Sequence, residues 1–159
     1  MAKPGKGDKR EPRAIQNRRA RHDYAILEEV TAGLVLQGSE VKSIFLGNAH
    51  LNDSYCRVHQ GEMWLYNMDV EPYEHSAVNS HERRRDRKLL LHRREINTLE
   101  RKTMEKGLTL IPLSVHFDEK GRVKVLIGLG RGKAAYDKRE SIAKRDAARE
   151  VDRELGRRG

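Results

Sequence analysis

The chain has 159 residues, a length typical of one domain with appendages. Its formal net charge of +9 indicates a polyanionic partner but says nothing about the fold. The single cysteine, Cys56, excludes an internal disulfide and a cysteine-rich metal site, and no segment has the ~20 apolar residues of a membrane span. We therefore expect a cytoplasmic protein without a secretory signal.

Positive charge is concentrated in three segments of the chain. Residues 1–22 hold eight Lys and Arg against two acids, residues 81–102 hold nine against four, and residues 131–159 hold ten against six. The rest of the chain is net acidic, so the cations form patches, which favours a nucleic-acid partner. An anionic membrane surface is a poorer fit because no amphipathic stretch pairs a basic face with a broad apolar one.

In chain order, residues 1–14 form a Lys-, Pro- and Gly-rich arm that we expect to be mobile. Three arginines, Arg18, Arg19 and Arg21, and the ring of His22 follow it. Arginine forms forked bonds to phosphate and lies flat on bases, and histidine stacks on them. These residues therefore favour RNA contact, although a solvated basic approach to the first strand is the alternative.

The next segments predict a strand, a break and a short helix. Tyr24–Val30 alternates as a strand, and we expect Ala32-Gly33 to interrupt it before Leu34–Leu36 resumes it. A glycine inside a strand marks a bulge or a place where another group comes close to the backbone. Apolar residues then recur at spacings of three and four, which predicts a helix over residues 37–46 that Gly47 ends. We expect this helix to direct Lys42 and Ser43 outward.

Two hairpins and a second helix are predicted further along. Leu51–His59 and Glu62–Val70 alternate around Gln60-Gly61, with Cys56 as a small buried residue and Trp64 as a core anchor. An amphipathic pattern over residues 87–106 predicts a helix with Leu89 on its apolar face. Residues 108–116 and 122–129 form a closing hairpin, in which Val123, Val125 and Ile127 face one way.

This pattern predicts a mainly β body over residues 15–130, with two or three short peripheral helices. An antiparallel sheet of this length avoids exposed edges best as a small closed barrel. Barrels of the oligonucleotide-binding (OB) type have this architecture, so the fold is compatible with RNA binding.

The basic C-terminal tail, residues 131–159, has too little apolar surface to fold alone. Asp137 and Glu140 have the spacing of a capping box, and small or apolar residues recur every four positions from Ala143. Because helix nucleation is costly, we expect this tail to be disordered alone and helical on a surface that neutralises its cations.

Several motifs resemble, in order, the signatures of the SsrA-binding protein (small protein B) family of bacterial trans-translation. They are Asn17–Tyr24, Gly38–Ser43, Asp53-Ser54-Tyr55, Arg87–His92 and Gly132–Arg139. The resemblance implies an OB-type barrel that binds the tRNA-like domain of transfer-messenger RNA (tmRNA) and enters the A site of a stalled ribosome. It also implies that the tail becomes helical in the vacant messenger channel, that elongation factor Tu contacts the complex through the charged RNA, and that no reaction is catalysed and no cofactor is used.

The resemblance also implies which residues act. The RNA-binding set would be Asn17, Arg18, Arg19, Arg21, His22, Ala32, Gly33, Lys42, Ser43, Arg87, Lys88, Leu90, His92 and Lys124. The set that acts on the ribosome would be Gly132, Lys133, Tyr136, Asp137, Lys138, Arg139, Lys144, Arg145, Arg149 and Arg153. The chain departs from the family pattern at Thr31, His92 and Ala134.

Two other classes of protein fit this sequence less well. A nuclease is disfavoured because no His, Asp and Glu cluster has metal-ligand spacing, and no nucleophile motif or phosphate loop occurs. A structural ribosomal protein, also basic and tailed, would remain on the ribosome in high salt, whereas a rescue factor would leave with its RNA.

Overall fold

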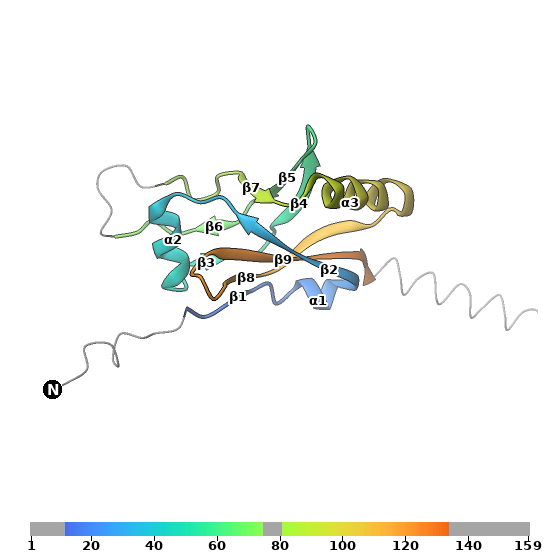
Figure 1. Ribbon diagram of the computed structural model, residues 1–159. Helices are drawn as coiled ribbons and strands as arrows, with labels where there is room; N and C mark the ends of the chain where they lie inside the picture. The colour runs from blue at the N-terminus through green and yellow to red at the C-terminus, as the bar shows by residue number, and fades with distance from the viewer. Residues whose placement is uncertain (1–11, 75–80, 134–159) are drawn as a thin grey trace, which may run out of the picture.

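The computed structural model describes residues 12–74 and 81–133 (Figure 1). Its helices are α1 (Ala20–Asp23), α2 (Gly38–Phe45) and α3 (Arg93–Lys106). Its strands are β1 (Ile15–Gln16), β2 (Tyr24–Leu34), β3 (Ala49–His50), β4 (Tyr55–His59), β5 (Glu62–Tyr66), β6 (Asp69–Val70), β7 (Arg87–Leu90), β8 (Thr109–Phe117) and β9 (Val123–Gly132). The mainly β architecture with few helices confirms the predicted class. None of the helices in these ranges is long and apolar enough to cross a bilayer.

The strands pair in an unbroken antiparallel series. Within the described ranges, seven strands form one sheet in the order β1-β8-β4-β5-β7-β2-β9, and β9 pairs with β8 as well as with β2. Starting from β8, each strand pairs with the next in the order β4, β5, β7, β2 and β9, and β9 then pairs with β8 again. We call this series the ring of pairings. β3 and β6 form a separate two-stranded ladder.

The core lies inside this ring of pairings. On β9 the side chains of Val123, Val125 and Ile127 are buried, as their alternation predicts, while Lys124 and Leu126 are only half-buried on the other face. α2 and α3 add Ile44, Ile96 and Leu99 to the same apolar cluster. The helices thus cover the core, and one face of β9 remains available to carry polar side chains.

The β4–β5 hairpin confirms the predicted turn. Gln60 and Gly61 both have positive φ, 51° and 77°, as a two-residue turn between twisted strands requires. Cys56 is buried as predicted, and burial raises the pKa of its thiol. The strands are shorter than predicted, because residues 51–54 form a turn in which the Ser54 hydroxyl donates to the Leu51 carbonyl.

The predicted interruption of the strand at Ala32-Gly33 is wrong, whereas the close approach to the backbone expected at the glycine is confirmed. β2 runs without interruption from Tyr24 to Leu34, and its register shift lies between Ile26 and Glu28. A Cβ on Gly33 would lie 3.3 Å from the Cβ of Leu90, so the glycine marks a close approach of neighbouring strands.

The predicted start of the long helix is also wrong. Residues 87–90 form strand β7, and α3 begins only at Arg93. Arg87 and Leu89 are both buried while Lys88 and Leu90 are not, which is the alternation of a strand. The sequence did not predict this alternation, because an arginine such as Arg87 is normally expected at the surface. β1 and α1 were not predicted separately.

Gly130 provides a test of the β2–β9 ladder. A Cβ at this position would overlap the backbone carbonyl of Ala25, whereas a Cβ on Gly132 meets nothing within 4 Å. We expect Gly130→Ala to lower the free energy of unfolding by about 1–3 kcal/mol, because backbone cannot yield as a side chain can. Urea denaturation measures the effect. Gly132→Ala is the matched control, and equal stabilities of the two variants would contradict the ladder.

Candidate RNA-binding surface

The first group of predicted site residues surrounds α1. Ala20 is buried against Ile111 and Leu113, and this contact anchors the short helix on β8. Because Ala20 occupies the inner side, Arg18, Arg19 and Arg21 are exposed. Local packing thus presents the arginine cluster to solvent.

The cations of this group differ in their partners. Nη2 of Arg21 donates to Oε1 of Glu29 at 2.8 Å, and Nδ1 of His22 lies 2.9 Å from Oδ1 of Asp23. Arg18 and Arg19 have no carboxylate partner among residues 12–74 and 81–133. The two unpaired guanidinium groups are the better ligands for phosphate, since they need not give up an ion pair.

Asn17 holds the start of this group in place. Its side chain is only 9% exposed and donates through Nδ2 to the Pro112 carbonyl at 2.9 Å, while its backbone N–H donates to the Leu113 carbonyl. These bonds tie the segment to β8. Asn17 therefore positions the arginines that follow it.

A second group lies at the far end of β2. Gly33 is the register partner of both Leu90 on β7 and Lys124 on β9. Leu90 is 53% exposed, and the three residues line a hollow of about 320 Å³ with the apolar residues Leu36 and Val41. The structure thus brings together three residues that lie far apart in the sequence.

The two groups are separated along β2. The first adjoins Tyr24 and the second includes Gly33, nine residues later in one strand. At about 3.3 Å per residue, the two groups lie roughly 30 Å apart. A single small ligand cannot span them, whereas a folded RNA can.

The remaining exposed residues of the set are distributed over α2, β7 and the start of α3. Nζ of Lys42 lies 5.2 Å from the centre of the Tyr73 ring, and Nζ of Lys88 pairs with Glu62 at 3.0 Å. His92 is exposed, and its backbone N–H donates to Glu95 in the first turn of α3.

Three predicted contacts require correction. Ser43 is 1% exposed and Arg87 is 0% exposed, so the outward orientation expected for Ser43 is wrong and neither side chain is available at the surface. Ala32 is 1% exposed and packs in the core. Ser43 lies beside Ile44 on the inner face of α2, one step around the helix from Lys42.

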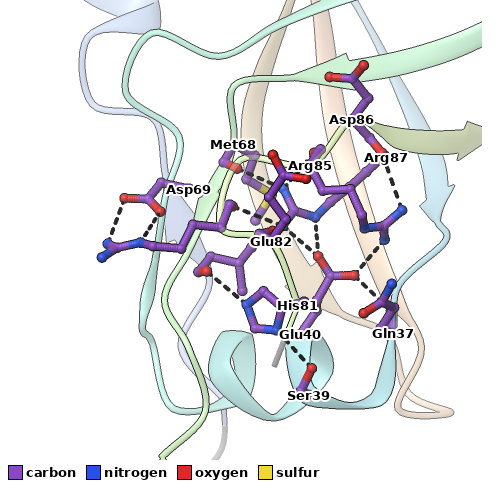
Figure 2. A network of polar contacts seen from close by, with 12 residues as sticks. Gln37, Ser39, Glu40, Met68, Asp69, His81, Glu82, Arg85, Asp86 and Arg87 are labelled. Atoms are coloured by element: carbon purple, nitrogen blue, oxygen red, sulfur yellow. Dashed lines mark hydrogen bonds and ion pairs between the residues drawn. The ribbon is translucent and has the colours of Figure 1, made fainter. Parts of the chain in front are cut away.

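A buried ion pair that the sequence analysis missed explains the position of Arg87. Its Nε donates to Oε2 of Glu40 at 2.5 Å, and Arg85 donates to Oε1 of Glu40 at 2.6 Å (Figure 2). Arg87 also donates through Nη1 to the Met68 carbonyl at 2.7 Å. Glu40 and Arg87 are both fully buried, so the pair connects α2 to β7 inside the protein.

The charges of this network stabilise one another. Burial alone would raise the pKa of Glu40, but bonds from Arg85, the Gln37 N–H and Arg87 outweigh it, so the pKa is lowered. His81 extends the network, since its Nδ1 lies 2.8 Å from the Ser39 hydroxyl and its Nε2 2.9 Å from the Val70 carbonyl. The alternation of Arg87 with Leu89 was the available signal for a buried arginine.

The set predicted to act on the ribosome is mostly not described. Gly132 ends β9 as the register partner of Tyr24, and Lys133 follows it, exposed. Tyr136, Asp137, Lys138, Arg139, Lys144, Arg145, Arg149 and Arg153 lie outside the described residues, as does most of the N-terminal arm.

Comparison with known proteins identifies the family. The model of the SmpB protein family matches residues 14–157. The chain belongs to the SmpB protein family. A relative from Carboxydothermus hydrogenoformans, named SsrA-binding protein, is 55% identical over 141 residues, which cover 88% of this chain and 93% of that one. Another so named, from Desulforudis audaxviator, is 56% identical over 146 residues, which cover 91% and 95%.

A solved structure has the same fold. It belongs to work described as "tmRNA-SmpB: a journey to the center of the bacterial ribosome". The two chains superpose with a TM-score of 0.64 and 48% sequence identity, over 76% of this chain and 84% of that chain. The described part of the chain therefore has the fold of that structure.

The Glu40–Arg87 pair yields a prediction about stability. Glu40→Ala would leave Arg87 buried without its counter-charge, so we expect it to lower the free energy of unfolding by about 3–5 kcal/mol. Glu105→Ala, at an exposed position of α3, is the control and should change it by less than about 0.5 kcal/mol. Urea denaturation at neutral pH measures both.

The pH dependence of the same measurement provides a further test of this pair. Because the folded pKa of Glu40 lies below its ordinary 4.5, its contribution is present above that value and is lost as pH falls through the folded pKa. The wild type should therefore lose more stability than Glu40→Gln as the pH is lowered from about 5 to about 3. Parallel acid profiles of the two proteins would contradict the assignment.

Proposed function

We propose that the chain is an RNA-binding protein of trans-translation that binds the tRNA-like domain of tmRNA. Its membership in the SmpB family carries this proposal, supported by relatives that are named SsrA-binding proteins. The unpaired arginines at α1 and the group of Gly33, Leu90 and Lys124 are the surfaces we assign to RNA. The family supports a binding role, not that of an enzyme.

The body would act as a closed barrel of the OB type. The ring of pairings from β8 to β9 supports this architecture, because it leaves β9 paired on both edges. A rigid body holds its RNA-binding groups at a fixed distance from each other. Two groups roughly 30 Å apart can therefore bind together only to an RNA whose shape matches that distance. Recognition of shape is the usual mode for structured RNA.

The tail would act on the ribosome. We infer that the body and elongation factor Tu bring the charged RNA into the A site, and that residues 131–159 enter the empty messenger channel, where Tyr136 stacks on a base and the later cations meet rRNA. The ten Lys and Arg of this segment support a polyanionic environment. β9 extends to Gly132, so the tail proper would begin at the end of that strand.

The assignment of Arg18 and Arg19 predicts a change in salt dependence. Replacing both by Ala should weaken binding of the isolated tRNA-like RNA and reduce the slope of log affinity against log salt by roughly one to two units. Filter binding over a salt series measures it. Arg101→Ala, an exposed arginine on α3, should leave the slope unchanged, and equal slopes for all three proteins would refute the assignment.

The division between body and tail predicts separable defects. Truncation after Lys133 should leave affinity for the tRNA-like RNA within a few-fold and abolish tagging of stalled chains, because the described body remains complete. Reconstituted translation on a message without a stop codon measures tagging. A variant whose residues 134–159 are shuffled is the control for charge alone and should also fail to tag. A large loss of RNA affinity on truncation would contradict the division.

A further inference from the structure

Two adjoining hollows lie where β2, β4 and β8 begin. The first, of about 260 Å³, is lined on one side by Asn17 and Arg19. The second, of about 620 Å³, is lined by Arg57 and Met104. Tyr24, Tyr55 and Thr109, the first residues of the three strands, line both. The hollows therefore meet at the two tyrosine rings and form one continuous surface.

Residues of β4, of β8 and of α3 line the second hollow. In the described residues these strands pair at one position, Cys56 with Leu110. α3 precedes β8 in the chain and is joined to it through Gly107. Met104, near the end of this helix, lines the hollow and is 78% exposed. Its volume falls within the roughly 300–1,000 Å³ typical of ligand sites.

The ring of Tyr55 contacts a second aromatic ring and a cation. It stacks on its cross-strand partner Tyr66, with ring centres 5.1 Å apart and an interplanar angle of 23°. Tyr55 remains 37% exposed, and the guanidinium of Arg57 lies over its ring, 5.7 Å from the ring centre. An exposed aromatic ring can stack on a nucleobase, and Arg57 could move from the ring to a phosphate when a base takes its place.

Charges surround the rings in a pattern that suits a nucleotide. Arg19 adjoins one hollow and Arg57 the other, and neither has a carboxylate partner within residues 12–74 and 81–133. Two carboxylates, Asp23 and Asp53, line the first hollow and Glu100 lines the second, and a carboxylate can accept a hydrogen bond from the amino group of a base. Each hollow thus has one arginine that a phosphate could contact, and the two tyrosines are common to both hollows.

We propose that this surface binds unpaired RNA nucleotides, with a base stacked on Tyr55 and backbone phosphates at Arg19 and Arg57. The inference rests on the proposed RNA-binding function and adds an unpaired element to the folded one. Tyr24, Tyr55 and Arg57 were not in the predicted set. Tyrosine and arginine also occur in surfaces that bind proteins. Here Arg19 and Arg57 are separate and have no ion-pair partner in the described residues, which favours a phosphate backbone over a protein partner.

The test uses a fluorescently labelled, single-stranded RNA hexamer and the full-length protein. Tyr55→Leu should weaken hexamer binding by about tenfold, the loss expected for one stacked base. Tyr55→Phe keeps the ring face and should bind as the wild type does. Phe45→Leu replaces an exposed aromatic on α2 and is the matched control. Arg57→Gln, at an exposed strand position, should reduce the salt slope by about one unit.

A parallel titration with the tRNA-like RNA separates this inference from the proposed function. Tyr55→Leu should keep its affinity for that RNA. If the wild type binds the tRNA-like RNA but not the hexamer, or if Tyr55→Leu and Arg57→Gln both bind the hexamer as the wild type does, the inference is overturned and the function stands. If the wild type binds neither RNA, the proposed function falls with it.

Discussion

β9 pairs with β2 along one edge and with β8 along the other, and the separation of the two RNA-contact groups along β2 follows from this double pairing. Lys124 lies at one end of the strand and Gly132 at the other, beside Tyr24. Gly130 occupies a position where a Cβ would meet backbone, so the strands can approach only because a glycine is there. One ladder therefore sets the distance between the two RNA-contact groups and the point from which the tail departs.

The Glu40–Arg87 pair connects α2 to this ring of strands. A buried ion pair adds little net stability over apolar residues of the same size, because both charges lose their hydration. Its geometric demand is strict, however, since Arg87 also donates to the carbonyls of Met68, Arg85 and Arg83. We interpret this network as the contact that fixes the position of α2, and with it Lys42, relative to β7.

Local patterns predicted the hairpins, the short helix and the inner face of β9, because each depends on neighbours in the sequence. Ser43 and Arg87 were misplaced because their burial depends on distant partners, which periodicity does not reveal. At Gly33 the sequence predicted a bulge or a close approach, but only the pairing of the strands reveals that Leu90 and Lys124 are the residues that approach it. The arginines at α1 were found from composition, whereas Tyr55 and Arg57 became a candidate surface only once β2, β4 and β8 were seen to begin together.

The two kinds of proposed contact differ in physical character. The arginines at α1 act through charge, which reaches about 10 Å at moderate salt and carries no base information. The tyrosine rings act only in contact, because stacking requires a base to lie against them. Tyr24 belongs to the hollows and is also the register partner of Gly132, the last residue of β9. A nucleotide seated in the hollows would therefore lie beside the strand from which the tail departs, so RNA binding by the body and placement of the tail would share one residue.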